Sequence, residues 1–305
     1  MIVSALVPVF AIILSGFLIS RINLVSAELW PGLEKLTYYF FFPALLVLNL
    51  AESNFDWIEL RQNTQVVLFG LVAISLIVIL YSKLIARDRS ALSSVYQGSI
   101  RFNTYIGLAC IDALYGDRGL ATAALCLAVY VPLVNVASVI SLSLHSTNGR
   151  NRWVTVFSST VSNPLVIACF IGISISYTGF RIPDLALESI TILSQPALTL
   201  GLLAVGAGIH ASAMGAQIGQ LCAALLNKML LFPAAVFAAC LLFKTGTELA
   251  TILILLSTLP APPSAYILAR QLGGNTALMA NIITVQTPVA LLSIPFWLDM
   301  SERFL

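Results

Sequence analysis

The chain of 305 residues is 59% hydrophobic and only 9% charged, with a formal net charge of +2. Soluble proteins carry about 25% charged residues, so this composition excludes an ordinary soluble protein and indicates an integral membrane protein. The five cysteines lie in apolar runs without C-x-x-C spacing, which argues against a metal site or a disulfide framework. We therefore expect neither a metal nor a cofactor, and no basic cluster points to nucleic acid.

Apolar segments long enough to cross a hydrocarbon layer of ~30 Å recur along the whole chain. In chain order, and numbered here as spans 1 to 10, they are residues 3–20, 31–51, 65–86, 94–114, 119–142, 154–176, 187–209, 218–243, 248–270 and 276–298. The polar joints between them are too short to hold a soluble domain. The first segment has no basic residue before Arg21 and no clear cleavage site, so we interpret it as a span and not as a signal peptide. The sequence thus predicts an all-α integral membrane protein with ten transmembrane helices.

Basic residues are distributed unequally over the two sides of the predicted membrane. One side carries Arg21, Lys35, Lys83, Arg87, Arg89, Arg150, Arg152 and Arg270. The other side carries Arg61, Arg118, Arg181, Lys244 and Arg303, together with most of the acidic residues. Because cytoplasmic loops carry the excess of Lys and Arg, both termini are predicted to face outward from a cell membrane.

The two halves of the sequence resemble each other. VPVFAIILSGFLIS at 7–20 aligns with NPLVIACFIGISIS at 163–176, and FPALLVLNLA at 42–51 aligns with QPALTLGLLA at 195–204. Residues 1–150 and 151–305 are therefore interpreted as two repeats of five spans each. Because five is an odd number, the second repeat enters the membrane inverted, an architecture typical of secondary transporters.

Three prolines, Pro260, Pro262 and Pro263, interrupt span 9. Proline removes a backbone donor and clashes with the carbonyl four residues earlier, so these residues predict a broken helix within the membrane. Such breaks are tolerated only inside protein or beside a water-filled cavity, and transporters place substrate sites there. The alternative interpretation is a kinked helix that serves packing alone.

Span 4 is the counterpart of span 9 under this repeat, and it carries a milder interruption. Asn103 and Thr104 favour a helix start, and Gly107 weakens the next turn. Two half-helices are therefore expected to begin near the midplane, one after Asn103 and one after Pro263 with Ser264 as its cap. Because the repeats are inverted, the N-termini of these two half-helices are expected to approach from opposite faces of the membrane and to point toward each other.

Helix N-termini favour an anionic substrate, but each supplies at most ~2 kcal/mol, whereas desolvating a carboxylate costs several. Side-chain donors must therefore contribute to the site. The candidate substrate-binding residues around the two breaks are Asn103, Thr104, Tyr105, Gly107, Pro262, Pro263, Ser264 and Tyr266.

Two basic residues lie deep enough to join them. Lys228 is about ten residues into span 8, roughly 15 Å deep, and is either a counter-charge for an anion, a donor to freed carbonyls or a structural brace. Arg101 binds substrate or extends to the membrane surface. Asn135 in span 5 and Gln286 in span 10 line the cavity or only connect helices by hydrogen bonds.

These elements resemble the auxin efflux carrier family, which includes the plant PIN-formed carriers and many bacterial members. The resemblance rests on Asn103, Thr104 and Gly107 as N-T-x-x-G, on Lys228 five residues before Pro233, and on A-P-P-S at 261–264. It implies a fold like that of bile acid/sodium symporters, with a scaffold of spans 1, 2, 6 and 7 and a transport domain of spans 3–5 and 8–10. It further implies that substrate binds where spans 4 and 9 cross, and that the transport domain moves like an elevator. Ala109 departs from the proline usual at this position, which puts the symmetry of the crossing in doubt.

The expected function is secondary transport, with export of a small organic anion such as a carboxylate. Coupling to H⁺ or Na⁺ and uniport both remain open, and a homodimer through the scaffold helices is expected. Two alternatives remain. One is a transport-inactive sensor or scaffold with a carrier fold; the other is an intramembrane enzyme, which the absence of paired acids or a dyad at depth disfavours.

Overall fold

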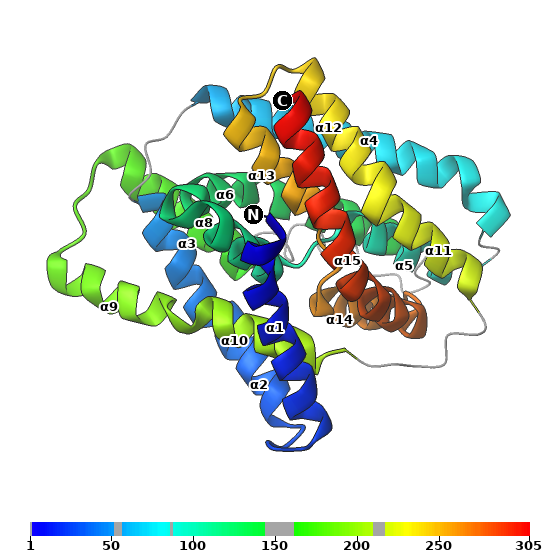
Figure 1. Cartoon of the computed structure of the whole chain (residues 1–305), viewed down its shortest axis with the longest axis horizontal. Helices are drawn as coiled ribbons and strands as arrows, with labels where there is room; N and C mark the ends of the chain where they lie inside the picture. The colour runs from blue at the N-terminus through cyan, green and yellow to red at the C-terminus, as the bar shows by residue number, and fades with distance from the viewer. Residues whose placement is uncertain (1, 52–56, 86–87, 144–161, 210–216) are drawn as a thin grey trace. The chain divides into compact units, whose positions relative to one another are not determined.

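The computed structural model describes residues 2–51, 57–85, 88–143, 162–209 and 217–305, and within these ranges every regular element is a helix (Figure 1). The helices are α1 (Ile2–Arg21), α2 (Leu29–Leu36), η1 (Thr37–Phe41), α3 (Phe42–Ala51), α4 (Trp57–Ile85), α5 (Arg89–Ile100), α6 (Thr104–Ser143), α8 (Pro164–Thr178), α9 (Asp184–Ser194), α10 (Pro196–Ala207), α11 (Ile218–Leu226), η2 (Asn227–Leu231), α12 (Phe232–Leu242), α13 (Thr247–Thr258), α14 (Pro263–Leu272) and α15 (Thr276–Phe304).

Each predicted apolar segment lies on one helix or on consecutive helices, with spans 4 and 5 sharing α6; residues 86 and 154–161 lie outside the described residues. By length and hydropathy alone, six of the described helical segments can cross a membrane, and seven if α13 and α14 form one broken span. Of the other predicted spans, span 2 is divided among α2, η1 and α3, the described part of span 6 is the shorter helix α8, and spans 4 and 5 together form the one segment Arg89–Leu142. The all-helical membrane character of the chain is thus established, and the number of ten spans stays a prediction.

The chain packs into two compact units. Unit 1 comprises Met1–Arg61, Tyr105–Val131 and Val161–Gly208. Unit 2 comprises Gln62–Thr104, Pro132–Thr160 and Ile209–Leu305. Each unit therefore takes segments from both halves of the sequence, so neither sequence half is compact by itself.

In unit 1, two helix pairs pack through glycines at equivalent positions of the two repeats. Helix α1 lies against α10 (Figure 1), and α3 lies against α8. A Cβ added to Gly16 of α1 would lie 2.1 Å from the carbonyl oxygen of Leu203, and one added to Gly172 of α8 would lie 2.6 Å from the Cβ of Leu50. Gly16 aligns with Gly172, and Leu50 with Leu203, in the repeat derived from the sequence. The same close contact thus occurs twice, which supports the internal repeat.

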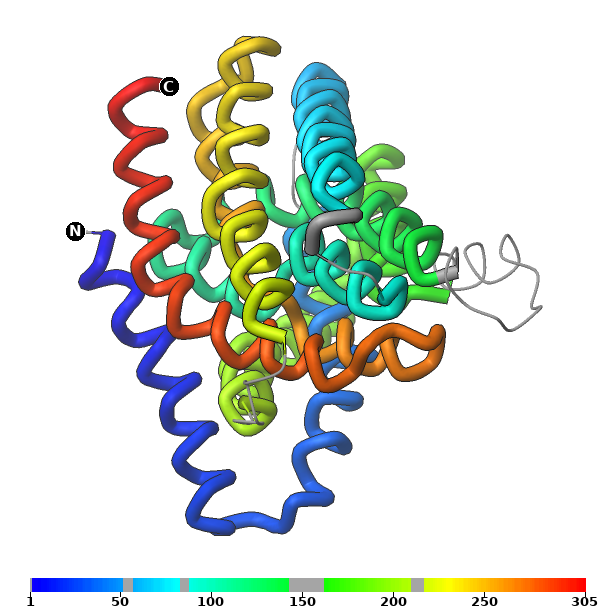
Figure 2. The backbone as a smooth tube through the Cα atoms, turned by 90° about the vertical axis from the view of Figure 1, so that its right-hand side faces the viewer, coloured from blue at the N-terminus to red at the C-terminus, as the bar shows by residue number. Residues whose placement is uncertain are grey.

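Unit 2 is built around α5, α11 and α15. Their buried apolar side chains, together with those of α14, form one cluster that includes Val95, Ala224, Ala265 and Ile282. Helices α11, η2 and α12 follow one another as one continuous run, and α15 changes direction along its length (Figure 2). Two prolines, Pro288 and Pro295, lie inside this helix, and proline is a common cause of helix bends.

Both π-helical turns of the described chain stand directly before a Phe-Pro pair. η1 precedes Phe42-Pro43, and η2 precedes Phe232-Pro233. A proline within a helix cannot donate to the carbonyl four residues earlier and crowds it, so the preceding turn widens. The carbonyl freed in this way by Pro233 is that of Met229.

Side chains of α15 satisfy this carbonyl. The hydroxyl of Ser293 donates to the Met229 oxygen at 3.0 Å, and the indole N–H of Trp297 donates to it at 2.9 Å. The widened turn is therefore a fixed part of unit 2, and it carries Lys228.

Local signals also set two helix ends. Helix α5 starts after Asp88, whose carboxylate accepts hydrogen bonds from the hydroxyl and the backbone N–H of Ser90 at 2.6 and 3.0 Å. These bonds lower the pKa of Asp88, mainly through the Ser90 hydroxyl. Within α6, Gly116 adopts φ 59° and ψ −154° and separates two helical segments, where the sequence places the end of span 4.

Candidate functional site

Two interrupted helices meet in unit 2. Helix α5 ends at Ile100, and residues 101–103 are non-helical before α6 begins at Thr104. Helix α13 ends at Thr258, and α14 begins at Pro263 after a bend of 57°. The backbone N–H of Asn103 donates to the carbonyl of Pro260 at 2.8 Å. We call the two non-helical segments, residues 101–103 and 259–262, the crossover.

The prolines account for the shape of the second segment. A residue before proline avoids the helical region, and Leu259 accordingly has ψ 145° before Pro260. Pro262 is likewise extended before Pro263 and occupies the N-cap of α14. Pro263 fills the first helical position, where its missing N–H costs nothing. The prediction that Ser264 caps this helix is therefore wrong: the two prolines already fill the cap and the first position.

The Ser264 side chain instead lies beside the first segment of the crossover. Its hydroxyl oxygen is 3.4 Å from the guanidinium Nη2 of Arg101, which donates to it. Arg101 thus points along unit 2 toward the N-terminus of α14. Pro263 has no N–H, so Ser264 also presents the first free backbone N–H of this helix.

Gln286 of α15 connects the crossover to the helices around it. Its side chain is fully buried, and its carbonyl oxygen accepts from the N–H of Ala261 at 2.9 Å. Its amide nitrogen donates to the carbonyls of Gly98 at 2.9 Å and Ala224 at 3.3 Å. Of the two interpretations left open by the sequence, these bonds correspond to the connection between helices. Gln286 thus supplies a partner for the Ala261 N–H in the second break and for the Gly98 carbonyl in the last turn of α5, and it also binds the Ala224 carbonyl of α11.

Lys228 lies on η2 beside the first segment of the crossover. Its side chain is fully buried, with Nζ 5.0 Å from the ring centroid of Phe232 and 5.9 Å from that of Phe102. Among the described residues, its ammonium has neither a hydrogen-bond acceptor nor an acidic partner. A buried cation in this state is costly unless a ligand pairs with it.

The neighbouring Asn227 anchors the same turn. Its amide nitrogen donates to the hydroxyl oxygen of Ser99 at 2.8 Å and also contacts the hydroxyl of Tyr81. The turn that carries Lys228 is therefore held against α5 and α4, close to where α5 ends.

Sequence reasoning missed Gln97. The side chain of this residue is fully buried in α5, one turn before Arg101, and both of its polar atoms lack a partner within the described part of the chain. Its backbone carbonyl accepts from the N–H of Arg101 at 2.8 Å. Gln97 lies near the predicted start of span 4, in a stretch with several polar residues, so its depth was hidden. Its position one helical turn before Arg101 was the signal that could have found it.

The remaining predicted residues are distributed over both units. In unit 2, Asn103 is buried, Thr104, Pro262 and Pro263 are half-buried, and Tyr266 is 38% exposed on α14. Asn135 is half-buried in α6, and no described residue forms a hydrogen bond with its side chain.

Tyr105 and Gly107 are buried in unit 1. The Tyr105 ring packs edge-on against Phe42, with centroids 4.6 Å apart, and covers Gly201. The structure thus brings together Arg101, Asn103, Pro260, Ser264, Gln286 and Lys228 within unit 2.

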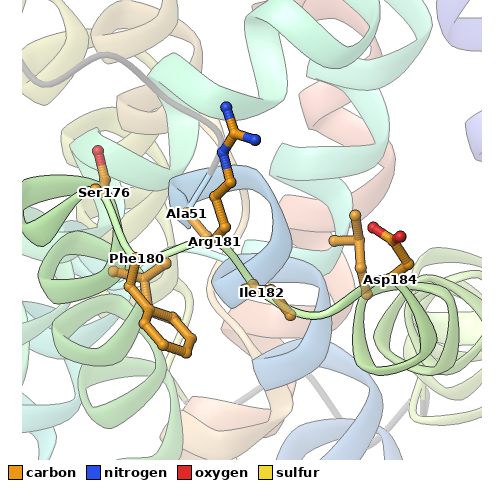
Figure 3. A pocket seen from close by; sticks show the side chains of 9 residues that line it. Ala51, Ser176, Phe180, Arg181, Ile182 and Asp184 are labelled. Carbon is orange, nitrogen blue, oxygen red and sulfur yellow. The ribbon is translucent and has the colours of Figure 1, made fainter.

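A cavity of about 400 Å³ lies elsewhere, in unit 1, between the end of α3 and the turn from α8 to α9. Figure 3 shows the side chains of Phe180 and Arg181 pointing in opposite directions from this turn. Arg181 and Asp184 at its edge are exposed, and none of the predicted site residues lines it. We therefore place the candidate site at the crossover and not in this cavity.

Comparison with protein families gives two matches to one family, described as "Membrane transport protein", over residues 1–161 and again over residues 150–298. The family model thus spans almost the whole chain as two repeats, which agrees with the repeat derived from the sequence. No curated protein matches the chain. The family transports substrates across membranes and is not an enzyme family. The chain belongs to this membrane transport protein family, the family of the auxin efflux carriers.

Proposed function

We propose that this protein is a secondary transporter of a small organic anion, and that the anion binds at the crossover in unit 2. The observation that carries the proposal is Lys228. Its ammonium is fully buried beside the crossover without an acid or a hydrogen-bond acceptor among the described residues. A carboxylate is the ligand that pairs such a charge and removes its desolvation cost.

The crossover supplies the remaining contacts. Arg101 and Ser264 are already in contact at 3.4 Å, and the start of α14 offers a free N–H and a partial positive charge. Two cations and a helix N-terminus together provide what the helix dipoles alone do not, since a dipole supplies at most ~2 kcal/mol. Asn103 and Thr104 stand at the start of α6, and in this proposal their polar side chains orient the anion.

We assign the finer features of the transport cycle to the same proposal. The chain has ten spans in two inverted repeats, with both termini outside the cell membrane, and it assembles as a homodimer through spans 1, 2, 6 and 7. The glycine contacts of unit 1 support a rigid scaffold, because close backbone approach fixes helix pairs. The helices of unit 2 that bear the site then move as the elevator, and the anion is exported.

The test is flux of labelled acetate, benzoate and succinate in proteoliposomes that contain the purified chain. We expect saturable transport of at least one carboxylate and no transport of its uncharged carboxamide. The Lys228→Met variant should lose most of this flux. The matched control is Arg270→Gln, because Arg270 is an exposed cation at the C-terminal end of α14.

Three other outcomes point elsewhere. Binding without flux supports the sensor alternative, and chemical conversion of the carboxylate supports the enzyme. Equal loss of flux in Arg270→Gln and Lys228→Met contradicts a site at the crossover.

A further inference from the structure

We propose that Phe102 and Phe232 are specificity-determining positioning residues: their ring faces hold the side chain of Lys228 as a charged ammonium and thereby make the crossover select anions over uncharged analogues. The proposal rests on the proposed anion transport, because it concerns the same site. Neither aromatic residue was among the predicted site residues, and neither touches the substrate in this proposal. They act through Lys228.

The geometry places the ammonium against two aromatic rings from different elements. Nζ of Lys228 lies over the Phe232 ring at 5.0 Å and over the Phe102 ring at 5.9 Å, both within the range of cation–π attraction. Phe232 is fully buried, and Phe102 is 5% exposed. The rings therefore take the place of the water that an exposed ammonium would bind.

None of the described acidic residues performs this task. The elements that contact η2 include α4, through the contact of Tyr81 with Asn227, and α5, α11, α12, α13 and α15; their described acidic residues are Glu59, Glu248, Asp299 and Glu302. Glu59 lies in the first turn of α4, roughly 33 Å along the helix from Tyr81, and Glu302 is exposed. Glu248 lies in the first turn of α13, about 15 Å along the helix from its end at the crossover. Asp299 is roughly 20 Å along α15 from Gln286, and it pairs with Arg303 at 2.9 Å.

The other titratable or basic groups on these elements are engaged or distant. Arg89 starts α5, and the Tyr96 hydroxyl is hydrogen-bonded to Ser75 at 2.7 Å. Cys222 of α11 is exposed, and Cys240 of α12 interacts with Thr245. The aromatic faces are thus the groups of the described structure that stabilise the charge on Lys228.

The position of Phe102 links this charge to the site. It stands between Arg101, which reaches Ser264, and Asn103, which bonds to Pro260. These three consecutive residues contact three different elements, α14, η2 and the second segment of the crossover. A ring held in the crossover therefore fixes the position of the ammonium relative to the substrate.

The experiment replaces the phenyl ring of Phe232 by mono-, di- and trifluorophenylalanine in the full-length chain. Fluorine withdraws electron density from the ring face and weakens cation–π attraction stepwise, while the shape of the ring changes little. In proteoliposomes, we measure KM and the maximal rate for the best carboxylate among acetate, benzoate and succinate. Competition by its carboxamide is measured in the same vesicles. The control is the same series at Phe69, whose ring packs on Phe243 at 6.2 Å and has no cation over it in the described part of the chain.

We expect the logarithm of KM for the carboxylate to rise in equal steps with fluorine number at Phe232, to about tenfold at three fluorines. Competition by the carboxamide and the maximal rate should stay constant, and the Phe69 series should be flat. A purely packing role for Phe232 gives the same small change at every fluorine number. That outcome, or an equal change for the carboxamide, overturns the inference.

Different results would contradict the proposed function and the role of the aromatic rings. If unmodified protein neither binds nor transports any of the carboxylates, the proposed function fails. If it transports a carboxylate and the Phe232 series is flat, only the role of the aromatic rings fails. The Phe102→Leu variant gives a second measurement: we expect it to raise KM for the carboxylate, with Phe102→Trp restoring it.

Discussion

The backbone N–H of Asn103 donates to the carbonyl oxygen of Pro260 at 2.8 Å, and this bond joins two helix breaks that come from opposite halves of the sequence. Each break leaves backbone groups without helical partners, and such groups are expensive inside a membrane protein. The two segments satisfy part of this requirement for each other. At the crossover, the hydrogen bond between the two segments therefore satisfies backbone groups that the substrate would otherwise have to pair.

Replacing Gln286 by Met should destabilise the protein by at least about 2 kcal/mol. The N–H of Ala261 and the carbonyls of Gly98 and Ala224 then lose their side-chain partner within the protein. Thermal unfolding in detergent measures the effect. Leu292→Met is the control, since Leu292 lies on the same helix and is 77% exposed. Equal melting temperatures for the two variants would show that the Gln286 bonds contribute nothing.

Alanine at Gly16 or at Gly172 should cost about 1–3 kcal/mol each, because the added methyl group meets a neighbouring helix at 2.1 or 2.6 Å. The two losses should be similar, since the two contacts are equivalent in the repeat. Gly32→Ala is the control: it is also helical, has no neighbour within 4 Å, and should gain up to about 1 kcal/mol. Unfolding by heat compares all three, and a neutral result at both Gly16 and Gly172 contradicts the close packing.

Because Ser293 and Trp297 both donate to the carbonyl of Met229, we expect their substitutions to have non-additive effects on the free energy of unfolding. Ser293→Ala and Trp297→Phe each remove one of its two donors and should cost about 1 kcal/mol apiece. The double variant should cost more than the sum, because only then is the buried carbonyl left without a partner. A double-mutant cycle by thermal unfolding measures this coupling. Strict additivity means that water or a backbone group replaces the lost donors.

The helices and the break in span 9 could be predicted from the sequence because both follow from local chemistry. The helices follow from apolar runs of membrane length, and the break follows from prolines at 260, 262 and 263 that cannot continue a helix. The repeat could also be predicted, because the same close helix packing requires glycine at the equivalent positions Gly16 and Gly172. The role of Gln286 could not be read from the chain, because its partners come from three separate segments. The burial of Gln97 was hidden for a similar reason, and the cap assigned to Ser264 ignored that two prolines can start a helix by themselves.

Asp88 predicts a local dependence of stability on pH. Its pKa is lowered by hydrogen bonds from Ser90, so its contribution is present above the unfolded value of about 4 and is lost as the pH falls through the lower folded value. Asp88→Ala should cost about 1 kcal/mol at pH 7, and this difference should shrink as the pH falls below 4. Asp88→Asn keeps the cap, so its stability should be close to that of the natural chain at low pH. The measurement is the free energy of unfolding of both variants between pH 3 and pH 7. If Asp88→Ala and Asp88→Asn have equal stabilities at every pH, the role of the carboxylate is contradicted.

Lys228→Met should raise stability while it removes transport. A buried ammonium without an acidic partner pays a desolvation cost that two aromatic faces offset only in part, and methionine fills a similar volume without this cost. We expect a gain of about 1–4 kcal/mol in thermal unfolding together with the loss of carboxylate flux. Lys228→Arg keeps the charge and should give the opposite result, with part of the carboxylate flux retained and no gain in stability. If Lys228→Met is less stable than the natural chain, Lys228 is a structural brace, and the anion must find its counter-charge in Arg101 alone.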